Sequence, residues 1–528
     1  MPKIKKVPKT KKVSKTKKEK ELFINYDDER AKKTIFGTTE KSNFILNMRI
    51  EQVDKLAFGI ISLAIILSAI GTFLTEFFRE INELPMMCFA VAGVAAMVFA
   101  LVVYQKRLYS KSILLPTIVY AVLFLLAIVS AVLSTDIAEA VKQFWNYFLY
   151  RDRTFLSNNI NIALKGFPGR GEGLFTLFCY ICFYLIAVRL SQSRQYIQKL
   201  FDVFVFLGCL QCFFALFQII PPIAKFFDFT YNNLFSITKL DVFLPNGASA
   251  SPIIFANFLA IIAPIAIIGA VKTDSKKRKI FYLIATFFFV FFMLKSQTTI
   301  GLVGAVISLL IAIFFARKAF MLITMSLALL LGVGSCFVYS KPLQFYDTGI
   351  IWEDSSYRIE ASGFLKISKV PFQKDSTIKT YQYLWSETLN VATETPVRFM
   401  FGVGEEQLAL AQKNTTQNMI VIYDNTFDKT YNDFIYILAT RGIFVLVLYI
   451  LFLIFAFRLC NIRQIFSALS VKNGKTFGTW QKKVCIISCF VYLLLSLLSF
   501  SAIETTPIFF VLLGLAVATG RFEGAETD

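Results

Sequence analysis

The sequence of 528 residues contains no histidine. This absence excludes a Ser-His-Asp triad, histidine-ligated zinc or haem, and imidazole acting as an acid or a base. The nine cysteines include two CxxC pairs, Cys179–Cys182 and Cys209–Cys212, but both lie in apolar runs and their spacing does not match a zinc ribbon. We therefore expect these cysteines to serve packing, and we expect no metal and no cofactor.

Charged residues are also few. They make up 17% of the chain, against about 25% in an average soluble domain, whereas apolar residues make up 56% and phenylalanine alone occurs 58 times. This composition argues against a soluble enzyme, a coiled coil or a disordered chain. Alternation of apolar and polar residues with a period of two is absent, which favours helices over barrel strands. The predicted fold class is an all-α integral membrane protein.

Apolar runs recur along the whole chain after the first fifty residues. A hydrocarbon core of roughly 30 Å requires about 20 residues of helix. Reading the sequence with this window predicts a bundle of about twelve transmembrane helices. They lie near residues 57–76, 85–104, 113–133, 173–190, 200–220, 252–271, 279–295, 299–315, 320–339, 434–457, 484–501 and 506–520.

Lysine and arginine collect in alternate loops, which predicts the orientation in the membrane. If the N-terminus is cytoplasmic, every basic loop falls on the cytoplasmic side, and Glu76, Glu80 and Glu83 fall on the other. We therefore predict a multi-pass membrane protein with both termini in the cytoplasm. Residues 1–50 are predicted to form a basic, disordered tail, because ten lysines stand in 1–20 and attract anionic membrane lipids. No aromatic residue is interleaved with these lysines, so nucleic acid is not an expected partner.

Three outward segments exceed the length of a turn, about 134–172, 221–251 and 340–433. The last lies between predicted helices 9 and 10, and a segment this long in a compact bundle is usually functional or a small domain. We expect it to be a helical extracytoplasmic subdomain that forms the site with the outer ends of the helices. The predicted order is a tail at 1–50, helices 1–9 at 51–339, the loop at 340–433, helices 10–12 at 434–520 and a cytoplasmic end at 521–528.

Local patterns on the outer side mark individual candidates. Arg170 precedes the fourth predicted span, where an arginine can grip a phosphate or anchor at the interface. A helix containing Leu384-Trp385 is expected to be followed by a glycine turn at Gly402-Val-Gly404. Thr430 and Asp433 have the spacing of a capping box, so the tenth span is expected to start there. A helix start concentrates free N–H groups and suits an anion.

Taken in order, these motifs resemble those of the O-antigen ligase and O-antigen polymerase superfamily of bacterial membrane glycosyltransferases. The resemblance covers roughly residues 50–520. The stretches that carry it are Arg170-Gly-Glu-Gly173-Leu174, Ser251-Pro252 with Ala256 and Leu259, Leu384-Trp385, Pro396, Gly402-Val-Gly404, and Asp428-Lys429-Thr430-Tyr431-Asn432-Asp433 followed by Gly442. Three positions depart from the family pattern: Tyr431 replaces a histidine, Tyr381 an arginine before Leu-Trp, and Thr298 the arginine of a Ser-x-Arg element.

The resemblance implies a protein of the bacterial plasma membrane that acts in surface polysaccharide biosynthesis. Such a protein transfers or polymerises a glycan from an undecaprenyl-diphosphate carrier to an acceptor hydroxyl on the outer face, and the acceptor is a glycan, a lipid or a protein. The diphosphate leaving group must be held by cations, for which arginine forks are best suited. The residues expected to hold the diphosphate or the substrate are Arg170, Arg358, Lys379, Arg398, Lys429, Asn432 and Arg441. An arginine as deep in the tenth span as Arg441 should face the bundle or a wet cavity.

The identity of the base stays open at this point. Tyr431 stands at the family's histidine position, but a phenol is protonated at neutral pH and is a poor base. Glu172, Glu405 and Glu406 are the alternatives. Catalysis can also rest on stabilising the leaving group alone, or this chain can be a catalytically silent member. A twelve-span transporter or flippase for lipid-linked glycans is the alternative function.

Overall fold

The computed structural model describes most of the apolar part of the chain. The described residues are 50–77, 84–105, 113–134, 163–164, 172–191, 193–219, 245–249, 251–339, 351–352, 377–408, 411, 426–427, 429–460 and 479–525. Within these ranges the chain is almost entirely helical, and one pair of two-residue strands is present. The predicted tail at 1–50 lies outside them except for Ile50, as does most of the predicted loop at 340–433, so both remain predictions.

Helices account for every one of the twelve predicted apolar segments. Their bounds are α3 Ile50–Phe77, α4 Leu84–Gln105, α5 Leu114–Ser134, α8 Leu174–Leu190, α9 Arg194–Ile219, α11 Pro252–Lys272, α12 Lys276–Lys295, α13 Thr299–Ile311 with the π-helix η3 Ala312–Ala316, α14 Ala319–Tyr339, α19 Asp433–Leu459, α21 Thr479–Leu495 and α22 Thr506–Ala525. The remaining elements are α15 Thr377–Thr393, α16 Pro396–Phe401, and the antiparallel strands β1 Ile351–Trp352 and β2 Thr426–Phe427.

Six of the described helical stretches are long and apolar enough to cross a membrane. They are Glu51–Ile70, Leu114–Leu133, Gln195–Ile219, Pro252–Lys272, Thr299–Ala316 and Asp433–Leu459. Four shorter helical stretches are also apolar, among them Leu174–Leu190. The protein is thus an all-α, multi-pass membrane protein, as the composition predicts, while the number of twelve spans remains a prediction.

Helix α11 forms the centre of the bundle. Every residue from Ile253 to Ala270 is buried, and α9, α12, α13 and α21 pack around it. Ser251 caps its first turn by accepting a hydrogen bond from the N–H of Ile254, and Pro252 occupies the first helical position, where no N–H is needed. The Ser-Pro element therefore opens this helix, in agreement with the sequence prediction.

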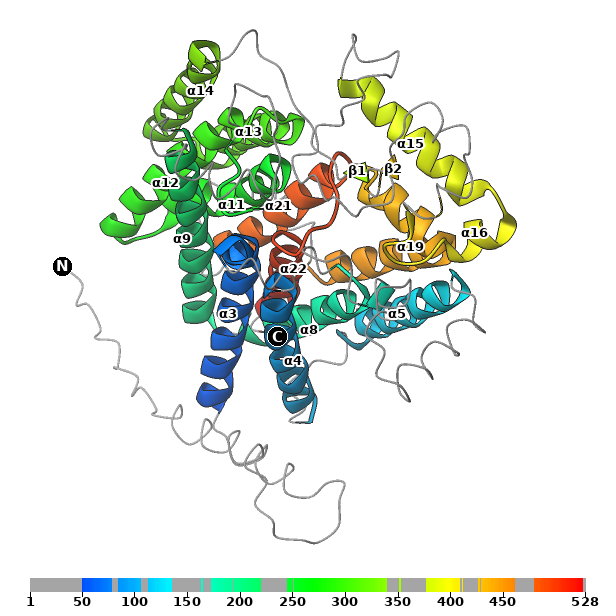
Figure 1. The fold of residues 1–528 in the computed structure, drawn as a ribbon. Helices are drawn as coiled ribbons and strands as arrows, with labels where there is room; N and C mark the ends of the chain where they lie inside the picture. The colour runs from blue at the N-terminus through cyan, green and yellow to red at the C-terminus, as the bar shows by residue number, and fades with distance from the viewer. Residues whose placement is uncertain are drawn as a thin grey trace, which may run out of the picture.

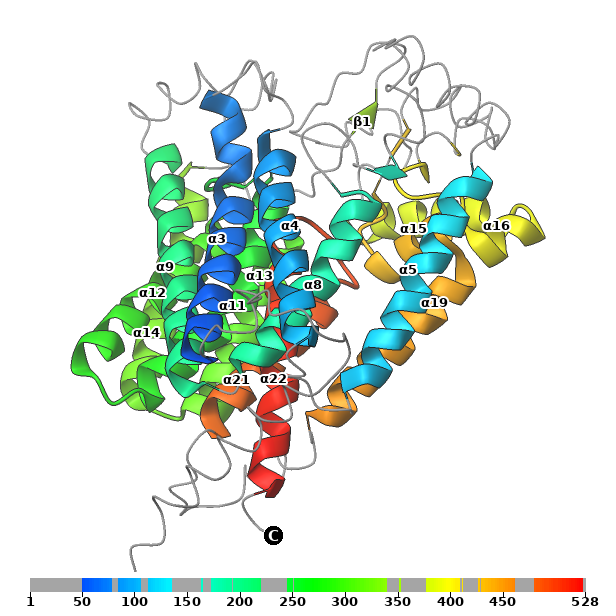
Figure 2. The ribbon, with the colours of Figure 1, turned by 90° about the horizontal axis from the view of Figure 1, so that it is seen from below.

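The other helices form two groups around this centre. Helices α9, α12 and α14 lie on one side, and α5, α19, α15 and α16 lie on the opposite side (Figures 1 and 2). Helix α22 packs along α8, α3 along α4, and α19 along α5. Figure 2 shows α15, α16 and β1 towards the end of the bundle away from the C-terminus, so these elements gather where the outer ends of the helices are predicted.

Helix α19 is broken at Gly442, whose φ of 83° and ψ of 173° only glycine adopts readily. The break frees the carbonyl groups of Ala439 and Thr440 from their helical partners. The N–H of Val403 donates to the first at 2.9 Å, and the N–H of Gly404 donates to the second at 2.8 Å. The glycine turn after α16 therefore supplies the N–H groups that these two carbonyls bind at the break in α19. The glycine turn at 402–404 and Gly442 thus form one structural unit.

The two backbones in this unit touch directly. A Cβ atom on Gly402 would lie 2.3 Å from the carbonyl carbon of Thr440, and one on Gly442 would lie 2.2 Å from the carbonyl oxygen of Met400. Gly402 also has a positive φ, of 77°. Neither position has room for a side chain, because the atoms in the way belong to backbone and cannot rotate aside.

We expect Gly442→Ala to destabilise the protein strongly. The backbone conformation alone should cost about 1–3 kcal/mol for a residue other than glycine, and the clash with Met400 adds to it. Gly59→Ala is the matched control, because a Cβ atom there meets nothing within 4 Å and alanine is the better helix former. Thermal unfolding of both variants in the same detergent measures the difference. Equal midpoints would contradict the backbone contact.

Candidate functional site

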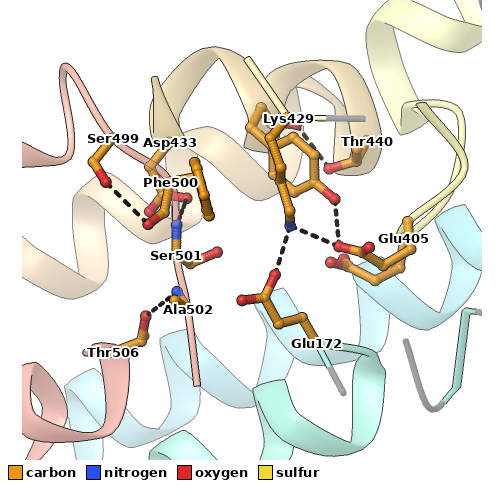
Figure 3. A network of polar contacts seen from close by, with 12 residues as sticks. Glu172, Glu405, Lys429, Asp433, Thr440, Ser499, Phe500, Ser501, Ala502 and Thr506 are labelled. Atoms are coloured by element: carbon orange, nitrogen blue, oxygen red, sulfur yellow. Dashed lines mark hydrogen bonds and ion pairs between the residues drawn. The ribbon is translucent and has the colours of Figure 1, made fainter. Parts of the chain in front are cut away.

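A buried ion-pair cluster lies at the point where the start of α8, the start of α19 and the end of the glycine turn meet. The ammonium of Lys429 is 2.6 Å from an oxygen of Glu172 and 2.8 Å from an oxygen of Glu406. The hydroxyl of Tyr436 donates to the same oxygen of Glu406 at 2.6 Å. Figure 3 shows Lys429 pointing between Glu172 and the turn that carries Glu405. All four cluster residues (Lys429, Glu172, Glu406 and Tyr436) are buried.

Aromatic rings shield the lysine of this cluster. Its ammonium lies 4.3 Å from the ring centre of Tyr436 and 5.9 Å from that of Phe500. Cation–π contacts stabilise a positive charge that has been withdrawn from water. The side chain of Lys429 is 2% exposed, so its charge is supported by carboxylates and rings rather than by solvent.

A second ion pair lies beside the first. The guanidinium of Arg441 donates to both oxygens of Glu405. Its Nη2 donates to one oxygen at 2.8 Å, and its Nε donates to the other. Bidentate pairing of this kind is among the strongest hydrogen-bonded arrangements in proteins. Arg441 thus faces the protein interior, as its depth in α19 predicts, with its charge held by a buried carboxylate.

The local backbone explains why Glu405 and Glu406 point in different directions. They follow directly after Gly404, which is anchored to Thr440. Glu406 has a positive φ of 56°, which is uncommon for a residue with a side chain. This turn sends Glu405 to Arg441 and Glu406 to Lys429. Strained conformations of this kind persist where the surroundings hold them, and they cluster at functional sites.

The start of α19 is fixed by Asn432 rather than by the capping box that the sequence predicts. The side chain of Asn432 accepts hydrogen bonds from the N–H groups of Phe434 and Ile435, both at 3.1 Å. Thr430 instead donates to the carbonyl of Asn432 at 2.8 Å. Asp433 accepts from the N–H of Ser501 at 3.3 Å. The predicted capping box of Thr430 and Asp433 is therefore wrong, because the side chain of Asn432 takes the N-cap position instead.

The segment between α21 and α22 packs onto this helix start. Helix α21 ends at Leu495, before the predicted boundary at residue 501. The N–H of Asp433 donates to the carbonyl of Ser496 at 2.8 Å, and the contact of Asp433 with Ser501 ties down the same segment. The chain leaves the helix because these backbone groups pair with α19, and this brings Phe500 beside Lys429.

Tyr431 lies within an aromatic core. It is 1% exposed, and its ring contacts Tyr381 and Phe500 edge-to-face, with 5.6 Å between centres in each case. Its φ is 52°. Tyr431 and Tyr381, two of the positions that depart from the family pattern, therefore contact each other. The third, Thr298, caps α13 by accepting from the N–H of Gly301 at 3.0 Å.

The remaining predicted residues are distributed as follows. Arg398 on α16 forms an ion pair with Glu394, four residues earlier, and both side chains are partly exposed. Arg170 and Arg358 lie outside the described residues, and Lys379 lies on α15 without a described side chain. The structure thus brings together Glu172, Glu405, Lys429, Asn432 and Arg441 around the start of α19. A role in binding or catalysis remains a prediction for each of them.

Some residues of this cluster are missing from the sequence-based candidates. Tyr436 lies four residues after Asn432, so helical spacing puts it on the same face, and that spacing was the available signal. Phe500 and Ser501 are predicted to end a span, and no local pattern links them to α19. Within the described residues no group of three or more histidine, cysteine, aspartate or glutamate side chains could hold a metal ion.

Carboxylates outnumber cations in the described part of the site. The cations are Lys429 and Arg441, and the carboxylates are Glu172, Glu405, Glu406 and Asp433. Each of the two cations is already paired. A diphosphate that binds either of them must therefore compete with a carboxylate, and it would release that carboxylate's negative charge nearby.

Fold and site together define a multi-pass helical membrane protein with buried ion pairs at one end of its bundle. Comparison with protein families narrows this class: a family model described as O-antigen ligase matches residues 281–450. This match confirms the resemblance to the O-antigen ligase and polymerase superfamily. The matched segment contains Glu405, Glu406, Lys429 and Arg441, whereas Glu172 precedes it. A comparison with curated proteins gave no match.

Proposed function

We propose that this protein transfers or polymerises a glycan from undecaprenyl diphosphate to an acceptor hydroxyl at the outer face of a bacterial plasma membrane. The family supports a lipid-linked glycan donor and a polysaccharide acceptor in general. The proposal includes twelve spans, cytoplasmic termini and an outward loop at 340–433. Its acceptor is a growing glycan, a lipid or a protein hydroxyl.

The observation that carries this proposal is a pair of cations that are largely withdrawn from water within the family segment. Lys429, with a side chain 2% exposed, is paired with Glu172 and Glu406, and Arg441, 12% exposed, is paired with Glu405. A buried cation is retained in a protein when it is paired, and phosphate oxygens offer it stronger pairing than water does. Such an arrangement suits the release of a diphosphate leaving group.

The chemistry follows from exchange of partners at these cations. The donor's diphosphate oxygens displace Glu405 from Arg441, or Glu172 or Glu406 from Lys429. A carboxylate that loses its ammonium partner becomes a stronger base. It accepts the proton of the acceptor hydroxyl while the acceptor oxygen bonds to the anomeric carbon. The bond from that carbon to the diphosphate breaks, and the diphosphate leaves with the electron pair. Arg170, Arg358 and Lys379 are further candidates to hold it.

Tyr431 has a different role in this proposal. Its ring fills the space between Tyr381 and Phe500, so it shapes the wall next to Lys429. A buried phenol is a poor base, and the carboxylates beside Lys429 are better placed to take a proton. We expect Tyr431→Phe to retain most transfer activity in membranes, because the ring contacts survive. Loss of more than about 10²-fold, the usual contribution of a general base, would instead assign the proton transfer to this hydroxyl.

One experiment separates this proposal from the two alternatives. Deleting the gene and profiling lipid-linked glycans should show accumulation of short undecaprenyl-diphosphate glycan in the outer leaflet, together with loss of a mature surface polymer. Accumulation in the inner leaflet would instead indicate a flippase. Rescue by a chain carrying Lys429→Met together with Glu405→Gln would indicate a catalytically silent member. Unchanged glycans would overturn the proposal.

A further inference from the structure

Helix α15 has two faces with different surroundings. Tyr381, Leu384 and Thr388 are buried against the bundle, while Gln382 and Ser386 are exposed. Trp385 lies at the border between these faces and is partly exposed. Its ring lies against that of Tyr381, with 6.0 Å between their centres. The indole therefore packs against the bundle while part of the side chain stays exposed.

The indole N–H of Trp385 has no acceptor among the described residues, although the nitrogen itself is buried. Tryptophan carries a single donor and no acceptor, and a buried indole N–H usually finds a partner. An acceptor is thus missing on a side chain that is itself partly exposed. A ligand that offers a hydroxyl oxygen beside an apolar face would satisfy both properties of this side chain.

Aromatic contacts connect Trp385 to the ion-pair cluster. Tyr381 contacts Tyr431, Tyr431 contacts Phe500, and the ring of Phe500 faces the ammonium of Lys429. Helix α15 also packs against α19, which carries Tyr436 and Arg441. Figure 1 shows α15 beside α19. Trp385 therefore stands at the outer end of a row of rings that ends at the cation proposed to hold the diphosphate.

We propose that Trp385, with Gln382 and Ser386, forms a glycan-binding subsite for a pyranose sugar. The C–H face of the sugar ring packs on the indole, and one hydroxyl accepts from the indole N–H. Gln382 and Ser386 are one helical turn apart and flank Trp385 on the exposed side, so an amide and a hydroxyl are available to further sugar hydroxyls. This inference rests on the proposed function and adds to it the place where the glycan is held.

The sugar can belong to the donor's glycan or to a glycan acceptor, and kinetics separate the two. The full-length protein in lipid nanodiscs is assayed with the donor varied at saturating acceptor, and then with the acceptor varied at saturating donor. Trp385→Phe keeps an aromatic face and removes the N–H, so we expect KM in one arm to rise by roughly 3–10-fold, the worth of one hydrogen bond. Trp385→Ala removes both contacts and should raise the same KM further. The arm that responds identifies the glycan.

A matched control is available at α21. Trp480 is also partly exposed and packs against Phe201, far along the chain from α15. Trp480→Phe should leave both KM values unchanged. If the wild-type protein is active and both Trp385 variants keep wild-type KM in both arms, the subsite is overturned while the proposed function stands. If the wild-type protein neither transfers nor binds glycan, both proposals are overturned.

Discussion

Replacing Lys429 by methionine is expected to reduce glycan transfer by about 10²–10³-fold, the usual loss when one preorganised charge at a leaving group is removed. The substitution keeps a long apolar side chain and deletes the ammonium that Glu172 and Glu406 share. Two buried carboxylates then face each other without their cation, so stability should also fall, by about 3–5 kcal/mol. Transfer assays and thermal unfolding of purified protein measure the two effects.

The loss of stability must be separated from the loss of chemistry. The double variant Lys429→Met with Glu406→Gln removes one carboxylate with the cation and should regain most of the lost stability, because the remaining charge imbalance is smaller. Its transfer should stay low, since no ammonium is present to meet the diphosphate. Recovery of transfer together with stability would show that Lys429 acts only in folding.

The ion pair between Arg189 and Asp54 serves as an independent control. Arg189 at the end of α8 binds Asp54 of α3 with 2.8 Å between Nε and the carboxylate, at the other end of α8 from Glu172. Arg189→Gln should also lower stability, because it leaves the partly buried carboxylate of Asp54 without its cation. The folded fraction should keep its transfer activity. If Lys429→Met loses transfer activity while Arg189→Gln keeps it, the cluster at Lys429 is the functional one.

The helices of this protein could be predicted from the sequence because the bilayer requires them. Each apolar run must satisfy its backbone within its own segment, so length and apolarity suffice to predict helix positions, and Pro252 and Ser251 locate one start. Arg189 lies at the end of the predicted span 173–190, and the structure pairs it with Asp54 of α3 from the last turn of α8. A count of basic residues cannot show such pairing.

The site could be predicted only in part, because its geometry depends on contacts between distant segments. The glycine motifs at Gly402 and Gly442 are visible in the sequence, but their mutual backbone contact is not. The pairing of Lys429 with Glu172 joins residues 257 positions apart. Glu172 and Lys429 belong to two of the long segments predicted between spans, and the structure brings these two residues into contact. Which carboxylate meets which cation is decided by the break in α19 and by the positive φ of Glu406.

If a diphosphate competes with Glu405 for Arg441, replacing Glu405 should strengthen donor binding and weaken the stability of the donor-free protein. Glu405→Gln removes the carboxylate that a diphosphate would have to displace, so the donor should bind more tightly, with KM for the donor lowered by about 10-fold, equivalent to about 1.4 kcal/mol. The same variant leaves the guanidinium of Arg441 without its bidentate partner in a buried place, so the donor-free protein should lose about 3–5 kcal/mol of stability. Adding donor should therefore raise its melting temperature more than that of the wild type.

The pair of Arg398 and Glu394 provides the matched comparison, because it joins the same two residue types at the exposed bend between α15 and α16. Glu394→Gln should change stability by at most about 1 kcal/mol, since exposed ion pairs contribute little, and donor KM should stay unchanged. Arg441→Lys keeps the charge of Arg441 and loses its fork, so donor binding should weaken although the cation remains. A Glu405→Gln variant whose donor KM rises, or whose melting temperature is no more sensitive to donor than the wild type, would show that Glu405 and the diphosphate do not compete for Arg441. The guanidinium would then be a structural cation that locks the broken helix to the glycine turn.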